Sequence, residues 1–89
     1  MRAVLTVIGK DAVGITAAVA AKCAEFKANI EDMTQKVMSD LFVMIMIVNV
    51  DMLVGKFTDF VDEMSALGKE KGLEIHTMHE DVFNAMHRI

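Results

Sequence analysis

One almost wholly apolar run, residues 41–50, limits the folds open to this 89-residue chain. A run of this length suits a buried strand, since a bilayer-spanning helix needs about 20 apolar residues. Its apolar residues fall on both parities, with Phe42 on one face and Val43 on the other. The run therefore predicts a central strand whose two faces both need a cover.

Strand-like and helix-like patterns alternate along the rest of the chain. Residues 2–8, 30–38 and 73–79 predict three further strands, and apolar residues at 3.6-residue spacing predict helices over 13–28 and 52–71. A short helix is predicted over 80–89. Asp11 and Asp51 are expected to cap the starts of the two long helices, and Asn29 and Gly72 to end them.

This order is βαββαβ with a tail helix. Right-handed crossovers interleave two βαβ units into one antiparallel sheet, with strand order 4-1-3-2 and both helices on one face. We therefore predict an α+β, ferredoxin-like sandwich over residues 1–79 and an amphipathic helical tail over 80–89. The outer strands should be those that carry charged residues, namely Glu31, Asp32, Lys36, Glu74 and His76.

Composition and motifs exclude several classes of function. The net charge of −4 argues against nucleic-acid binding, and the chain carries no pattern for membrane insertion. A lone Cys23 and the lack of a signal peptide predict a cytoplasmic protein. His76 and His79 point to opposite faces of a strand, so no metal site or cofactor is expected. No nucleophile–base pair is evident, and the chain is predicted not to be an enzyme.

The uncovered face of the central strand suggests self-association. Burying even ~400 Å² of apolar surface there would contribute on the order of 10 kcal/mol before entropy losses. The tail helix or a second copy is the natural cover, and we expect a homodimer. The predicted interface residues are Met44, Met46, Val82, Phe83 and Met86.

A glycine-containing turn, GKDAVG, joins the first strand to the first helix. Amide groups at a helix start are unsatisfied and attract carboxylates, and Gly14 lets a ligand approach the backbone closely. Asp11 can accept a hydrogen bond from an ammonium group or cap the helix, and the sequence leaves both roles open. An amino acid carries both of the charges that such a loop would recognise.

At these residues the chain resembles the ACT domain family. The resemblance rests on the segment Asp11 to Ile15, the pair Asn29-Ile30 after the helix, and Gln35 on the second strand. It spans nearly the whole chain. ACT domains are regulatory modules that bind amino acids, commonly where the first loop of one subunit meets the second strand of its neighbour. The resemblance implies a ligand site made of Asp11, Val13, Gly14, Ile15, Asn29 and Ile30.

The resemblance extends to single-domain bacterial ACT proteins, a group related to repressor-like regulators of glycine cleavage. It implies a homodimer that binds a small molecule, which in this family is commonly an amino acid, and signals through a protein partner. The alternative is an interaction module that has kept the fold and lost its ligand. Which amino acid binds, and which partner responds, is not readable from the sequence.

Overall fold

The predicted α+β, ferredoxin-like class is confirmed by a computed structural model, which describes residues 1–10 and 13–86. The elements follow the predicted order. They are β1 (Arg2–Gly9), α1 (Ile15–Glu25), β2 (Asn29–Met38), β3 (Leu41–Asn49), α2 (Phe57–Lys71), β4 (Glu74–His79) and α3 (Glu80–Met86).

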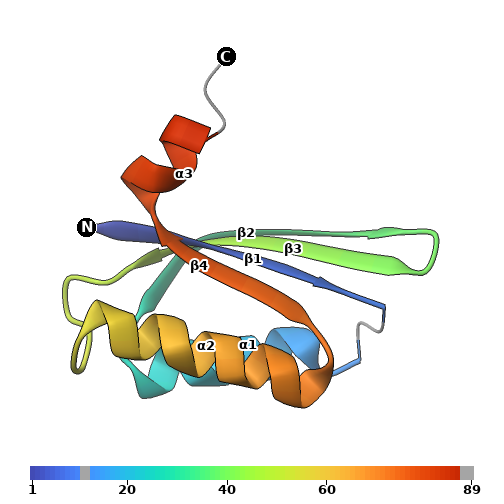
Figure 1. The fold of residues 1–89 in the computed structure, drawn as a ribbon, viewed down its shortest axis with the longest axis horizontal. Coiled ribbons are helices and arrows are strands. Elements are labelled where there is room, and N and C mark those ends of the chain that lie inside the picture. Colours follow the sequence, from blue (N-terminus) through green and yellow to red (C-terminus); the bar gives the residue numbers. More distant parts are fainter. Residues whose placement is uncertain (11–12, 87–89) are drawn as a thin grey trace.

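The four strands form one antiparallel sheet in the order β2-β3-β1-β4, which is the predicted order read from the other edge. Helices α1 and α2 cover one face, and α3 stands off the opposite face (Figure 1). The charged strands β2 and β4 are the edges, as expected, and the apolar strands β1 and β3 lie between them.

The core lies between the sheet and helices α1 and α2. It takes alternate residues of the central strands, including Leu5 and Val7 from β1, together with Val19 of α1 and Phe60 of α2. Met44 and Met46 belong to this core and have no exposed surface. The prediction that they border the uncovered face is wrong, because the pairing of β3 with β1 turns its even-numbered residues toward the helices.

The face without α1 and α2, here called the open face, carries the odd-numbered residues of β3. Val43 and Ile47 are partly exposed and Ile45 is 39% exposed. Val43 and Ile47 pair with Ile8 and Val4 of β1, and Ile45 pairs with Thr6, so the middle of the open face is mainly apolar. The predicted second apolar face of the central strand is therefore present.

The start of α2 differs from the prediction by five residues. Asp51 does not cap the helix; its main-chain N–H donates to the Asn49 side chain at 2.9 Å. The following loop is tied to the end of α1, where the Val54 N–H donates to the Phe26 carbonyl at 2.9 Å, and Gly55 has a φ of 80°. A helix cannot begin until the chain has passed this left-handed residue.

The sequence predicts the end of α2 correctly and the end of α1 incorrectly. Gly72 ends α2 in the left-handed conformation, as predicted. The left-handed residue after α1 is Lys27, with a φ of 59°, and Asn29 is already the first residue of β2. No helix in the described ranges is long and apolar enough to cross a membrane.

Cys23 faces the core from α1, and its burial raises the pKa of the thiol to about 11. We expect iodoacetamide to alkylate the native protein slowly at pH 8, because thiolate is roughly 200-fold scarcer than at the ordinary pKa near 8.5. Mass spectrometry should show rapid labelling once guanidinium unfolds the chain. Equal labelling rates in the native and unfolded states would contradict the buried position.

Candidate functional site

The first loop ends where α1 begins, at Gly14. This glycine has a φ of 73°, and its carbonyl accepts the first helical hydrogen bond, from the Ala18 N–H at 3.0 Å. The amides of the turn before Ala18 therefore have no partner within the helix itself. The first turn of α1 carries no acidic side chain. This end of the helix is thus suited to a negatively charged group.

The first turn of α1 is held against β2 by one polar contact. The Thr16 hydroxyl donates to Oε1 of Gln35 at 3.0 Å and also lies 3.9 Å from the Met44 sulfur. Gln35 therefore lies on the helix-covered side of β2, close to the first loop. This contact fixes which part of β2 borders the candidate site.

The other predicted ligand residues differ in what they expose. Asp11 lies outside the described residues. Val13 is 86% exposed, whereas Ile15 is buried in the core, so that only its backbone can meet a ligand. Asn29 is exposed at the start of β2, and the half-buried Ile30 packs against the core.

These residues form two groups at opposite ends of the sheet. Asn29 pairs with Asn49, which pairs with Arg2, whereas the first loop leaves β1 after Gly9. Seven residues of extended strand separate Arg2 from Gly9, a distance of roughly 23 Å. A single chain therefore does not bring Asn29 and Ile30 to the Gly14 loop.

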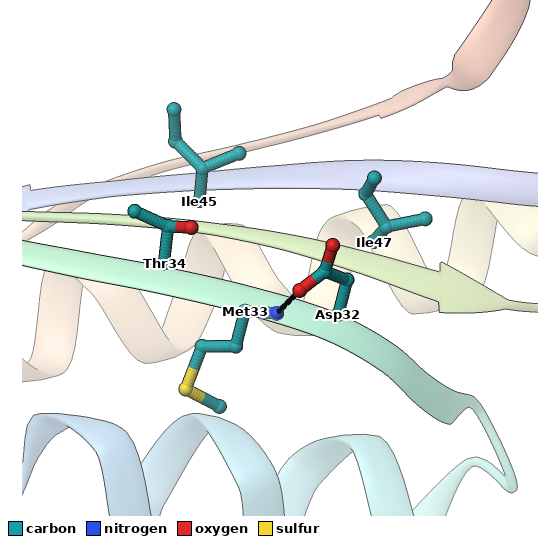
Figure 2. Close-up of a pocket in the computed structure, with 5 residues that line it drawn as sticks. All are labelled: Asp32, Met33, Thr34, Ile45 and Ile47. Atoms are coloured by element: carbon teal, nitrogen blue, oxygen red, sulfur yellow. Dashed lines mark hydrogen bonds between the residues drawn. The ribbon is translucent and has the colours of Figure 1, made fainter.

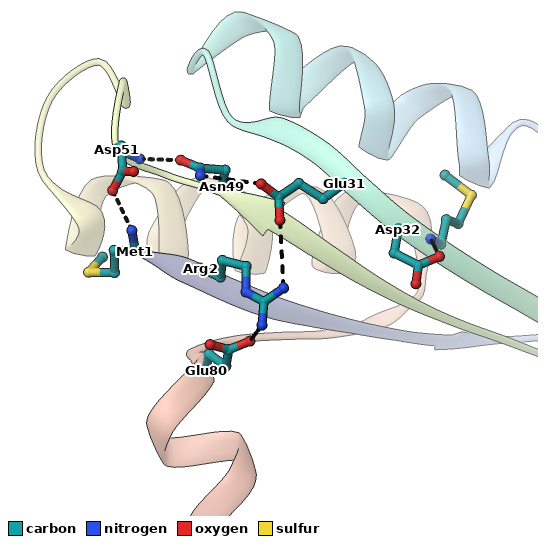
Figure 3. Close-up of polar contacts among 8 residues, drawn as sticks. Met1, Arg2, Glu31, Asp32, Asn49, Asp51 and Glu80 are labelled. Atoms are coloured by element: carbon teal, nitrogen blue, oxygen red, sulfur yellow. Dashed lines mark hydrogen bonds and ion pairs between the residues drawn. The ribbon is translucent and has the colours of Figure 1, made fainter.

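A polar cluster occupies the Asn29 end of the sheet (Figure 3). Arg2 forms ion pairs with Glu31 on β2 and with Glu80 at the start of α3. Glu31 also accepts a hydrogen bond from the Asn49 amide at 3.3 Å. The α-amino group of Met1 binds Asp51, and this hydrogen bond and charge lower the pKa of the Asp51 carboxyl.

On the open face, the described residues form a larger and a smaller shallow hollow. The larger, of about 410 Å³, lies between β1, β3, β4 and α3, and its lining includes Thr6, His76 and Phe83. The smaller, of about 190 Å³, lies over β2 and β3, where Ile45 and Ile47 stand beside Asp32 and Thr34 (Figure 2). Residues 1–10 and 13–86 contain no cluster of three or more potential metal ligands.

A family model for the ACT domain matches residues 2–78. The chain belongs to the ACT domain family. A UPF0237 protein of Listeria innocua is 44% identical over 89 residues, all of both chains, and one of Methanopyrus kandleri is 46% identical over 99% of this chain and 98% of its own. The solved structure titled "ACT domain protein from Streptococcus pneumoniae" has a TM-score of 0.83 and 37% identity, with 98% of each chain covered.

The suspected resemblance to the ACT family is therefore confirmed. ACT domains generally bind small molecules and are often dimeric, so this ACT chain is a module of the ligand-binding, regulatory kind. The structure titled as a putative glycine cleavage system transcriptional repressor shares the ACT fold at a TM-score of 0.70 and 21% identity. The match covers 89% of this chain and 47% of that one.

Sequence reasoning missed two polar residues of this ACT chain. Thr16 directly follows the predicted loop, and a hydroxyl in the first turn of a helix was the available signal. Arg2 joins residues 29 and 78 positions away along the chain, in Glu31 and Glu80. No local sequence pattern predicts such a contact, because the contact depends on which strands become neighbours in the sheet.

Proposed function

We propose that this ACT domain is a homodimer that binds a free amino acid and passes the binding event to a protein partner. The amino acid would lie between the Gly14 loop of one copy and the β2 start of the other. The observation that carries this proposal is the separation of the two groups of family-motif residues, which one chain keeps at opposite ends of its sheet.

The free edge of β2 offers a way to unite the two groups. β2 is ten residues long, mostly exposed, and pairs only with β3 among the described strands. An exposed strand edge of this length is a template for pairing with another chain. Antiparallel pairing of two β2 edges across a two-fold axis, in full overlap, sets the second copy's Asn29 beside Met38.

Met38 ends β2 at the same end of the sheet as the first loop, since β2 and β1 both run antiparallel to β3. The pairing therefore supports a site with the Gly14 loop on one side and Asn29 and Ile30 of the second copy on the other. Two-fold symmetry gives two such sites in each dimer.

The chemistry of the two halves suits a zwitterion. The free amides at the start of α1 favour a carboxylate, and Gly14 leaves the backbone open to it. Asp11 in the loop and Asn29 of the second copy carry oxygen atoms that accept hydrogen bonds from an ammonium group. The output would pass to a cytoplasmic protein partner, in keeping with the reduced and buried Cys23.

Calorimetry with the common amino acids tests the proposal, and a Gly14→Ala variant localises the site. We expect one or a few amino acids to bind, and Gly14→Ala to weaken binding by about tenfold or more, or ~1.4 kcal/mol. Gly72→Ala is the matched control. Both glycines have φ near 72° and nothing within 4 Å of an added Cβ, but Gly72 lies beside β4, the edge opposite β2. Folded protein that binds no amino acid would contradict the proposal.

Mixing two inactive variants tests whether each site is shared between copies. Gly14→Ala and Asn29→Ala should each bind poorly alone. In a mixed dimer, the intact loop of the Asn29→Ala chain meets the intact Asn29 of the Gly14→Ala chain, and one complete site returns. Recovery of binding after subunit exchange supports a shared site. No recovery, with exchange demonstrated by native mass spectrometry, would place the site within one chain and contradict the dimer arrangement.

A further inference from the structure

The open face has an apolar centre, and one row of residues across it ends in opposite charges. Pairing across the sheet aligns its residues in rows that run from β2 to β4. One row consists of Lys36, Val43, Ile8 and Glu74, and the next consists of Thr34, Ile45, Thr6 and His76. Both rows are polar at their ends, and between the ends the first carries Val43 and Ile8 and the second carries Ile45 and Thr6.

Lys36 and Glu74 stand at the two ends of the first row, on opposite edges of the sheet. Both are exposed. A two-fold axis parallel to the strands, between two facing sheets, would exchange the β2 edge for the β4 edge. Lys36 of each copy would then face Glu74 of the other, giving two charge pairs at the rim and apolar contact at the centre. The face is thus complementary to itself.

Helix α3 covers only half of the open face. It contacts β1 and β4, where Val4 is buried to 3% exposure, and leaves the β2–β3 half uncovered. Two of its apolar side chains remain exposed, Val82 at 50% and Met86 at 65%. The uncovered half is the one that contains the hollow beside Ile45 and Ile47 (Figure 2).

We propose that the open face binds the open face of a second copy, with the two sheets aligned about that axis. In each copy α3 rises over β1 and β4. The same symmetry places this helix above β2 and β3 of the other copy. Val82 and Met86 then lie over the hollow of Asp32, Thr34, Ile45 and Ile47. One symmetry operation therefore pairs Lys36 with Glu74 and covers the exposed apolar residues of both α3 and β3.

The uncovered half of the open face is small, so the two α3 helices must supply much of the contact. Two strands about 4.8 Å apart and three rows about 6.7 Å apart give roughly 200 Å² of uncovered sheet on each copy. The exposed surface of each α3, seated on the uncovered half of the other copy, adds to this area. This contact uses the face of the sheet and leaves the edge of β2 free. It therefore stands independently of the proposed amino-acid site.

Sedimentation velocity of a Met86→Glu variant tests this interface. A carboxylate at this exposed position should not disturb folding, but in the interface it would be buried without a partner. We expect the native assembly to fall to half its mass. Met52→Glu is the matched control, since Met52 is 77% exposed in the loop before α2, and its assembly should keep the native mass. An unchanged mass for Met86→Glu would overturn the proposal.

A charge exchange tests the orientation of the two copies. Glu74→Lys would set a lysine opposite Lys36 of the other copy, and we expect association to weaken by about threefold or more, in line with a surface pair. Adding Lys36→Glu to the same chain reverses both partners and should restore association. Failure of the double variant to recover would contradict the proposed axis. Amino-acid binding, measured in parallel, reports on the β2 edge and separates a failure there from a failure here.

Discussion

Replacing Phe60 with alanine is expected to lower the free energy of unfolding by about 3–5 kcal/mol. Phe60 has no exposed surface and lies on α2 at the centre of the core. Its ring meets Phe26, the residue directly after α1, edge to face with centroids 5.5 Å apart, and Phe57 at 6.4 Å. The substitution leaves a cavity and removes the aromatic contact that joins the two helices. Urea unfolding followed by circular dichroism measures the loss.

Met52→Ala serves as the control for that measurement. Its side chain is 77% exposed, and removal of an exposed side chain changes stability by no more than about 0.5 kcal/mol. Phe60→Ala could instead lower the free energy of unfolding by less than about 1 kcal/mol, with the slope of that free energy against urea concentration unchanged. The core packing described above would then be wrong.

Gly68→Val is expected to destabilise the protein by about 3 kcal/mol, at the upper end of the usual cost of overpacking. Gly68 is buried where α2 packs on the chain entering β4. A Cβ at this position would lie 2.8 Å from the Leu73 carbonyl oxygen and 3.2 Å from Cγ1 of Ile75. The backbone cannot move away freely, because the Leu73 N–H donates to the Gly68 carbonyl at 2.7 Å.

Thermal or urea unfolding measures this effect, with Ser65→Val as the matched variant. Ser65 lies three residues earlier on α2 and is exposed, so it reports the helix propensity of valine without the clash. Equal stability of the two variants would show that α2 can lift away from β4 without cost, and would contradict the tight approach at Gly68.

The strand order was predictable because apolarity differs among the strands. β1 and β3 are rich in Val, Ile, Leu and Met, whereas β2 and β4 carry charges that central strands exclude. The face of β3 that enters the core was not predictable. Met44 and Met46 on one parity are as apolar as Ile45 and Ile47 on the other, and only the pairing with β1 decides between them.

The ligand residues stay a prediction, and the sequence did not indicate where in the fold they lie. The family motif identified Gly14 and Asn29 together, since both occur at fixed positions along the chain. Their separation depends on the direction of β2 relative to β1, which follows from the completed sheet. The Thr16–Gln35 hydrogen bond likewise requires α1 to lie over β2. Contacts of this kind come from tertiary structure and leave no local pattern.

Strand β3 has no polar face, and its open-face side chains are therefore exposed when the protein is first made in the cell. A newly synthesised chain that has folded alone still presents Val43, Ile45 and Ile47 to the crowded medium around the ribosome. Such a surface promotes aggregation until it is covered. Under the proposed pairing of open faces, production of intact protein would depend on how fast newly made chains meet one another, and we expect low expression levels to favour chaperone capture over assembly.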